Sequence, residues 1–184
     1  QYLGVNYDTC HFAVGFEEPL NALPALVNHG IKLSKIHLSS ALKVRPTREA
    51  RAELKKFADD VYFHQVVVRD ENGNRSIYRD LPDALADAPQ IPDPGPQTQS
   101  LSEWRIHFHV PLHAPAAPPL ANTNDHLLGT LDLLAENPTI CSHLEMETYT
   151  WEVLPPELKS QDVADQLAGE YQWTLARLKE RGLY

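Results

Sequence analysis

Four short segments of the chain carry clusters of the residue types that bind divalent metals in proteins. Carboxylates, imidazoles and one thiol fall at positions 6–11, 35–37, 107–109 and 145–147. Each cluster lies at the end of a short run that alternates like a β-strand, and each run is followed, directly or after a loop, by an amphipathic helical stretch. Parallel strands that end side by side bring such side chains together, so the sequence predicts a divalent-metal site.

Residue parity separates the two faces of each run, because side chains alternate across a strand. One face is apolar in all four runs, as with Ile36 and Leu38. The candidate metal ligands lie on the other face or just past the strand: Asp8, His11, His37, His107, His109 and Glu147. Mixed carboxylates and imidazoles favour Zn²⁺, Mn²⁺ or Fe²⁺ over Mg²⁺ and Ca²⁺.

Some of these residues have alternative explanations. The four runs could belong to an antiparallel sheet whose polar face contacts water. Asp8 could cap the following turn, and His11 could be a hydrogen-bond donor in a loop. One of His107 and His109 is expected to bind the metal, and the other to hold a partner or the substrate. Cys10 is expected to be a small buried residue rather than a thiolate ligand.

Two glutamates near the end of the last run are the candidates for catalysis. Glu145 or Glu147 could act as a general base beside the metal. Glu145 could instead replace Glu147 as a ligand, or pair with Lys35 or Arg105. The residues expected to contact a substrate are Lys35, Arg105, Tyr149 and Trp151.

The elements that would position these residues alternate along the chain. Strands are predicted near 3–8, 33–40, 104–112 and 143–151, with a loop at 39–42. Helices are predicted near 19–30, 46–58 and 123–136, and a long one follows Pro156. The apolar stripe of this last helix is predicted to consist of Val163, Leu167, Tyr171, Leu175 and Leu178.

The segment 61–102 interrupts this alternation. A β-rich run at 61–68, a turn at 70–74 and a return at 76–78 predict an inserted hairpin. A short helix near 81–88 and a Pro/Gln-rich linker at 89–100 are expected to follow. Four βα units imply parallel strands, so residues 1–184 are interpreted as the C-terminal half of one (β/α)8 TIM-barrel domain. About as many residues again would then precede Gln1.

Composition narrows the class of protein. The 184 residues are 42% hydrophobic and 22% charged, which is typical of a globular chain. The net charge of -9 disfavours nucleic acid as a partner. No apolar run reaches the roughly 20 residues of a membrane span. Two cysteines are too few for a disulfide framework, so a cytoplasmic protein is expected.

The metal-ligand clusters carry a family resemblance. The string Asp8-Thr9-Cys10-His11 resembles the fifth-strand motif of the xylose isomerase-like TIM barrels, which include sugar isomerases, epimerases and endonuclease IV. The segments 5–11, 35–42, 104–112 and 143–151 together resemble the EboE metabolite-traffic family within that superfamily. The resemblance implies a barrel, a small metabolite as ligand and a membrane prenyltransferase-linked export system as partner.

The resemblance also implies roles for individual residues. Asp8, His37 and Glu147 match the metal ligands of the superfamily, and His11, His107 and His109 match ligands of additional metals in its multi-zinc members. A further glutamate ligand would come from a strand before Gln1. Three functions are compatible with this set: a metal-dependent sugar isomerase or epimerase, an endonuclease IV-like phosphoesterase, and a non-catalytic metabolite carrier or scaffold. The first is ranked highest.

Overall fold

The strands form two separate sheets. The computed structural model describes residues 3–88, 102–114, 116–147, 150–159 and 162–184. A parallel sheet has the order β1 (Val5–Asp8), β2 (Leu33–Leu38), β8 (Leu144–Met146). An antiparallel sheet has the order β5 (Arg75–Tyr78), β4 (Val66–Arg69), β6 (Glu103–His109), β3 (Ala41–Val44), β7 (Leu120–Asn122).

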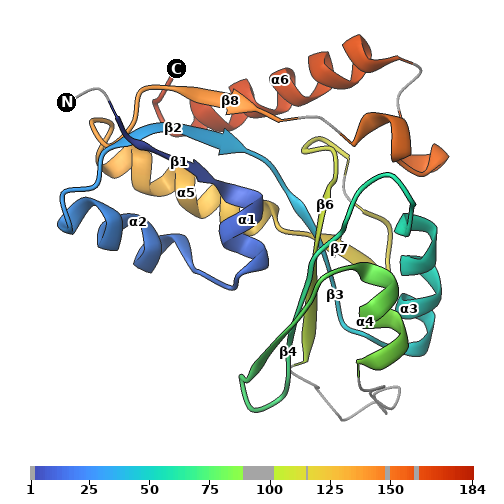
Figure 1. Ribbon diagram of the computed structural model, residues 1–184. Helices are drawn as coiled ribbons and strands as arrows, with labels where there is room; N and C mark the ends of the chain where they lie inside the picture. Colours follow the sequence, from blue (N-terminus) through green and yellow to red (C-terminus); the bar gives the residue numbers. More distant parts are fainter. Residues whose placement is uncertain (1–2, 89–101, 115, 148–149, 160–161) are drawn as a thin grey trace.

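One continuous segment joins the two sheets. β2 ends at Leu38, and after Ser39 and Ser40 the chain enters the other sheet as β3 (Figure 1). Ser39 is 2% exposed and Ser40 is fully buried, and the Ser40 hydroxyl accepts a hydrogen bond from the Thr123 amide. This seam between the sheets therefore consists of buried polar residues whose hydrogen bonds are made within the protein.

The TIM-barrel prediction is wrong. In a barrel, the run that contains the two histidines would be a parallel neighbour of β2. Instead β6 is antiparallel to both β3 and β4, and β8 pairs directly with β2. No closed barrel forms among the described residues. The same finding contradicts the barrel fold that the EboE resemblance implies.

Strand β3 explains the difference. Its first two residues, Ala41 and Leu42, fall in the segment predicted as a loop, but Leu42 and Val44 are buried beside Ile106 and Trp104 of β6. The expected hairpin also forms, with Gly73 at φ +84° in its turn, but β4 pairs with β6 and is an integral part of the sheet. The linker at 89–100 lies outside the described residues.

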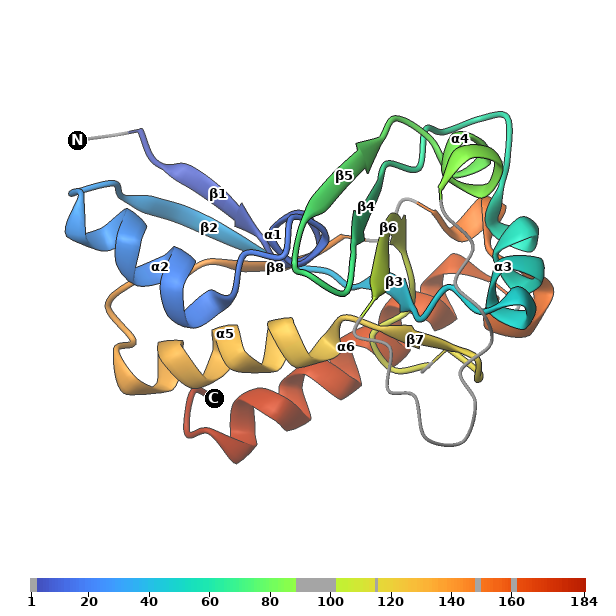
Figure 2. The ribbon, with the colours of Figure 1, turned by 90° about the horizontal axis from the view of Figure 1, so that it is seen from below.

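Six α-helices are found in the described part of the chain: α1 (Thr9–Val14), α2 (Pro19–Asn28), α3 (Arg48–Leu54), α4 (Leu81–Asp87), α5 (Asn124–Glu136) and α6 (Val163–Glu180). Single turns of 3₁₀ helix occur at Lys55–Phe57, Trp151–Val153 and Pro156–Leu158. α2, α5 and α6 lie on one side of the parallel sheet (Figure 2). None of the helices traced here has both the length and the apolarity to cross a bilayer.

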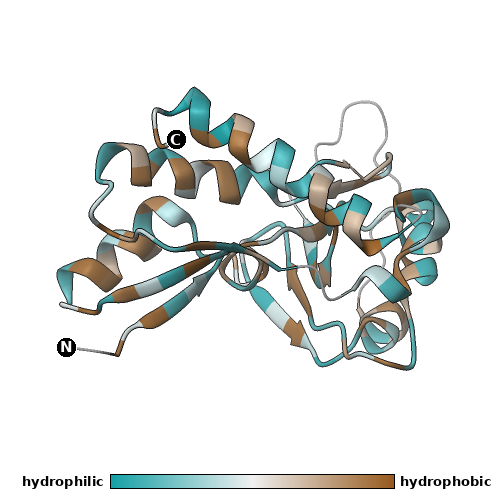
Figure 3. Ribbon diagram, turned by 90° about the horizontal axis from the view of Figure 1, so that it is seen from above, coloured by the Kyte–Doolittle hydropathy of each residue, from teal (hydrophilic) through white to brown (hydrophobic). Residues whose placement is uncertain are grey.

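Each sheet has its own hydrophobic core. Tyr7, Ile36 and Leu38 pack with Leu127 and Leu131 of α5 beneath the parallel sheet. A second cluster joins the antiparallel sheet to α3 and α4, and its largest members are Trp104, Phe108, Leu54, Phe57 and Leu81. Figure 3 shows hydrophobic residues along the strands of both sheets and on the helices. The apolar faces predicted from parity therefore belong to two cores rather than to one.

The buried face of α6 differs from the apolar stripe that was predicted to be buried. Val163, Tyr171 and Leu175 are 44%, 52% and 37% exposed. Leu178 of the predicted stripe is buried, and the other buried positions of α6 are polar: Gln166, Glu170 and Thr174. The helix is held to α5 by the Arg181 side chain, whose Nε donates to Asp132 Oδ1 at 2.6 Å.

Candidate metal centre

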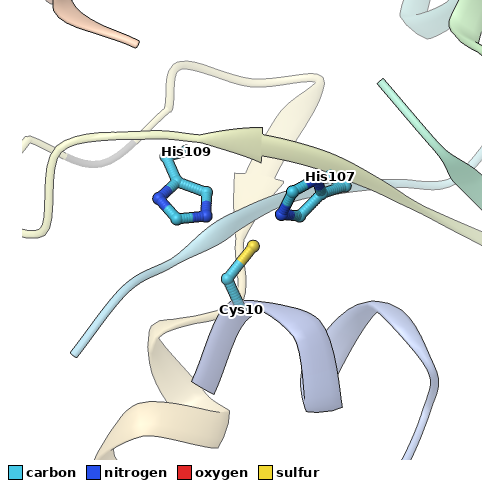
Figure 4. A group of neighbouring side chains, drawn as sticks. All are labelled: Cys10, His107 and His109. Atoms are coloured by element: carbon cyan, nitrogen blue, oxygen red, sulfur yellow. The ribbon is translucent and has the colours of Figure 1, made fainter. Parts of the chain in front are cut away.

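The candidate ligands meet at the seam between the two sheets. Asp8 ends β1, His109 ends β6, and Glu147 directly follows β8. One ligand atom from each of Asp8, His109 and Glu147 lies within 4.8 Å of the other two. A second set, Cys10, His107 and His109, meets the same limit. Figure 4 shows the Cys10 side chain of α1 pointing toward both imidazole rings of β6.

Asp8 has one oxygen committed to structure. Its Oδ1 accepts hydrogen bonds from the Cys10 and His11 amides at 2.9 and 3.1 Å, and from the Ser39 hydroxyl at 2.8 Å. These bonds cap the N-terminus of α1 and tie it to the seam. Burial would raise the pKa of Asp8, but the hydrogen bonds from Ser39 and the His11 amide outweigh it and lower that pKa. Oδ2 is then the oxygen left to bind an ion.

Substitution of Asp8 should separate its two roles. Asp8→Ala removes the cap and leaves three buried donors without this acceptor, so the free energy of unfolding should fall by about 1–3 kcal/mol. Asp8→Asn keeps a capping oxygen and should cost less than about 1 kcal/mol, yet weaken metal binding about as much as the alanine variant. Urea unfolding and zinc titration measure the two effects. Equal stability losses would contradict the capping role.

Glu147 and Asp8 form a carboxylate pair next to His37. His37 Nδ1 lies 3.0 Å from Glu147 Oε2 and 3.4 Å from Asp8 Oδ2. Burial, together with the hydrogen bond and charge of Asp8, raises the pKa of Glu147, and His37 only partly opposes this. Two carboxylates with opposite pKa shifts share a site that disfavours a second negative charge. A divalent cation between them would remove that repulsion.

The two histidines of β6 are poised as neutral ligands. Burial lowers the pKa of His109 to about 4, although the charge of Asp8 opposes the shift. Burial and then the charge of His11 lower the pKa of His107 to about 3. Neutral imidazoles keep a lone pair for a metal, so neither ring must lose a proton at neutral pH. His109 as a whole residue is 3% exposed, so it is shielded from bulk water.

Cys10 and His11 come from the first turn of α1. Cys10 is fully buried, and burial raises the pKa of its thiol well above the usual value. The His11 ring lies 4.2 Å from the His107 ring, centroid to centroid, but belongs to neither ligand set. The interpretation of Cys10 as a small buried residue accounts for its burial but missed its place beside two imidazoles.

The spacing of the sets is compatible with a bound ion. Tetrahedral zinc with bonds of about 2.1 Å holds its ligand atoms about 3.4 Å apart. Sets whose atoms already lie within 4.8 Å need only side-chain adjustments to reach that spacing. His37 would then contact the two carboxylate ligands and orient them, as outer partners of metal ligands commonly do. The described residues therefore fit a divalent ion.

Of the expected substrate contacts, two are engaged with other residues. Lys35 Nζ donates to Glu145 Oε2 at 2.8 Å, and this bond lowers the pKa of Glu145. Glu145 is half exposed and lies 3.7 Å from His37 Nε2, outside both ligand sets. Arg105 is buried against α1, where its Nη1 donates to the Ala13 carbonyl. Lys35 and Arg105 therefore make their hydrogen bonds to residues outside the two ligand sets.

Trp151 is the one expected aromatic contact that lies within the described residues. Trp151 packs against the core of the antiparallel sheet, and Lys159 Nζ lies 4.2 Å above its ring. Tyr149 is outside the described residues. The aromatic part of the predicted substrate contacts therefore gains no support from the arrangement of Trp151.

The sequence pattern does not predict a side-chain pair formed by His64 and Asp59 beside β6. His64 Nδ1 lies 3.2 Å from the His107 carbonyl, and His64 Nε2 lies 2.5 Å from Asp59 Oδ2. Burial opposes ionisation of Asp59, but hydrogen bonds from His64 and two backbone amides outweigh it and lower its pKa. Both nitrogens of His64 therefore lie close to oxygen atoms. The contact of His64 Nδ1 with the His107 carbonyl links the pair to the backbone of β6.

No sequence pattern marks His64 and Asp59 as partners of the centre, since both lie in a segment without regular structure. No sequence pattern marks Thr9 and Ser39 either, although their side chains form hydrogen bonds between α1 and the seam.

Comparison of the chain with protein-family models, with curated proteins and with solved structures finds no match. The centre is therefore described by its own geometry alone.

Proposed function

We propose that this protein binds a divalent metal ion at the seam between its two sheets, with Asp8, His109 and Glu147 as ligands. The convergence of these three side chains from β1, β6 and the segment after β8 carries the proposal. Asp8 lies 101 residues before His109, and His109 lies 38 residues before Glu147. The two carboxylates repel each other unless a cation or a proton lies between them. Zn²⁺, Mn²⁺ and Fe²⁺ suit this donor set.

The second set offers zinc an alternative position that shares His109. A thiolate and two imidazoles favour Zn²⁺ over Mn²⁺, so occupancy of the Cys10 set would make zinc the preferred ion. The thiol must lose its proton first, which costs free energy because its pKa is raised. The carboxylate set has no such cost above the pKa of Glu147, and we rank it first.

The reaction proposed for the centre is a metal-assisted isomerisation or epimerisation of a small sugar-like or secondary metabolite. The ion would supply polarisation of a substrate oxygen. Glu147 would be occupied as a ligand of the ion, which leaves Glu145, half exposed and paired with Lys35, as the candidate general base. The EboE likeness, a cytoplasmic location and a link to prenyltransferase-dependent export belong to the same proposal, and the free thiols of Cys10 and Cys141 are compatible with it.

Metal content tests the proposal directly. The purified protein, stripped with chelator and reloaded with Zn²⁺, Mn²⁺ or Fe²⁺ under argon, should retain one equivalent of ion after desalting. Titration calorimetry against each ion should give saturable binding that the chelator reverses. Retention no greater than that of a protein without a His/carboxylate cluster would refute the metal centre. Turnover of small polyols by the loaded protein alone would support the isomerase assignment.

Proton release should show which ligand set zinc occupies. The Cys10 thiol is protonated at neutral pH, so binding in the Cys10 set should release about one proton per zinc, and the affinity should rise about tenfold per pH unit. Binding in the carboxylate set should release protons only from Glu147, and its affinity should fall as the pH drops below the raised pKa of that carboxyl and be constant above it. Calorimetry in buffers of different ionisation enthalpy measures the release.

A cysteine variant provides the matching control for this measurement. Cys10→Ser should leave both the affinity and the proton count unchanged if the carboxylate set binds zinc. Cys141→Ser, at the other buried thiol, should change neither quantity in any case. A release of about one proton that disappears in Cys10→Ser would overturn the ranking of the two sets.

A further inference from the structure

A second pocket opens between the first turns of α2 and α5, two helices that lie side by side (Figure 2). Its walls come from residues 18–20 at the start of α2, from Arg105 of β6 and from three residues of α5. The described residues that line it belong to neither ligand set. Its volume is about 210 Å³, which suits a small metabolite.

His126 is a buried polar residue of this pocket. The residue is 4% exposed, and its Nε2 lies 3.0 Å from the Tyr7 hydroxyl. Its Nδ1 is buried and has no hydrogen-bond partner among the described residues. A buried polar atom without a partner costs free energy, so a ligand that contacts Nδ1 gains from that contact. Nδ1 is therefore the first group that a ligand of this pocket would satisfy.

The His126 ring carries a single proton at neutral pH. Burial, and then the charge of Arg105, lowers the pKa of His126 to about 4. Burial raises the pKa of the Tyr7 hydroxyl, which therefore keeps its own proton. When Tyr7 donates this proton to Nε2, the ring proton lies on Nδ1. In that tautomer Nδ1 is a donor, and its partner in the pocket must be an acceptor.

Arg105 adds a positive charge to the same pocket. The residue is 7% exposed, and its Nε and Nη1 already donate to Glu103 and to the Ala13 carbonyl. Its Nη2 lies 4.0 Å from Glu18 Oε1, which is too far for a hydrogen bond. Nη2 can therefore donate to a further acceptor. A guanidinium beside a ring N–H favours a carboxylate, because its two oxygens can accept from both.

The pocket also has an acidic side. The Glu18 side chain is 55% exposed, whereas the Asp125 carboxylate already pairs with Lys43 Nζ at 2.5 Å. Glu18 is therefore the carboxylate better placed to receive a cation. Glu18 and Arg105 lie next to each other, as do the ammonium and the carboxylate of an α-amino acid. The two charges of the protein thus match the two charges of such a ligand.

The remaining wall of the pocket is apolar. Pro19 and Leu20 line it, and Leu20 is 70% exposed. Gly129 contributes no side chain, and a Cβ atom there would lie 3.1 Å from Pro19 Cγ, so α2 and α5 are already close at this point. These surfaces fit a short aliphatic side chain next to the charged groups.

We propose that this pocket binds a small aliphatic α-amino acid. Its carboxylate accepts from Arg105 Nη2 and His126 Nδ1, its ammonium pairs with Glu18, and its side chain lies against Pro19 and Leu20. The inference goes beyond the metal centre and does not depend on it. A ligand of this size should bind with a dissociation constant of about 1 mM.

Three probes of equal chain length test the charge pattern by NMR titration of the ¹⁵N-labelled protein. Leucine has both charged groups, isocaproate lacks the ammonium, and isoamylamine lacks the carboxylate. Leucine should shift the Gly129 amide and the His126 ring signals saturably, and the other two should bind about tenfold more weakly or less. The ring signals should place the proton on Nδ1. Equal affinities for the three probes, a proton on Nε2 or no saturation by leucine would overturn the inference.

Glu18→Gln and Glu17→Gln form a matched pair for the ammonium contact. Both side chains are 55% exposed, but Glu17 pairs with Arg75 and does not line the pocket. Glu18→Gln should weaken leucine binding about three- to fivefold without weakening isocaproate binding. Glu17→Gln should change neither affinity. Equal leucine affinities in the two variants would contradict the proposed pairing.

Two substitutions of His126 test the carboxylate contact. The amide of His126→Gln lies near the position of Nε2 and leaves nothing at Nδ1, whereas the amide of His126→Asn lies near Nδ1. Leucine affinity should fall about tenfold in His126→Gln and less in His126→Asn. Urea unfolding shows whether each variant folds, and the Glu18 pair decides if neither does. An affinity in His126→Gln equal to that of the unaltered protein would overturn the inference.

Discussion

Replacement of His109 by alanine is expected to abolish measurable zinc binding. His109 belongs to both ligand sets, so its loss leaves two protein ligands in either position. Loss of an outer partner costs about 10- to 100-fold in affinity, and loss of a ligand should cost more than the upper end of that range. Calorimetric titration of the purified variant with zinc measures the change.

His143→Ala is the matched control for this prediction. The His143 side chain is 64% exposed and belongs to neither ligand set. Its removal should leave the zinc dissociation constant unchanged within about twofold. His109→Ala and His143→Ala with the same affinity would show that zinc binds elsewhere on the protein. Loss of binding in both variants would contradict the ligand sets, because His143 belongs to neither of them.

Replacement of Arg105 by alanine is expected to give the largest loss of stability, about 3 kcal/mol in the free energy of unfolding. The guanidinium is 7% exposed, donates from Nε to Glu103 at 2.6 Å and from Nη1 to the Ala13 carbonyl at 2.7 Å, and lies 4.1 Å from the Phe16 ring centroid. Its loss leaves a buried carbonyl and a partly buried carboxylate without their donor. Urea unfolding monitored by tryptophan fluorescence measures the change.

Arg69→Ala is the control for Arg105. Arg69 lies over the same Phe16 ring at 4.3 Å and 4.0 Å from the same Glu103 carboxylate, but its side chain is 35% exposed. Such a pair contributes at most about 1 kcal/mol. Equal losses in the two variants would show that stacking on Phe16, rather than the buried hydrogen bonds, holds α1 against β6. Arg105→Lys should recover only part of the stability, since an ammonium cannot make both bonds at once.

Local sequence determined most helices and the faces of the strands. Pro19 at the start of α2, Thr47 before α3 and the Asn72-Gly73 turn act within a few residues of themselves, so their effects are readable from the chain alone. Alternation along β2 and β6 correctly separated the apolar residues from the candidate ligands, since parity depends only on the backbone. The types of residue in the metal centre follow from the same pattern.

Tertiary structure decided which strand edges meet and which side of α6 faces inward. A four-residue strand such as β3 has too weak a local β-preference to be distinguished from a loop in the sequence. Its pairing with β6 and β7 stabilises it as a strand. Because of this pairing, the strands form two sheets instead of the predicted barrel. Likewise Val163, Tyr171 and Leu175 of the stripe predicted for α6 are exposed, whereas Gln166 and Glu170 are buried and line a pocket together with His109 and Glu147. Contacts between residues far apart in sequence have no local signature, so patterns showed which side chains could bind a metal, and packing determined how they meet.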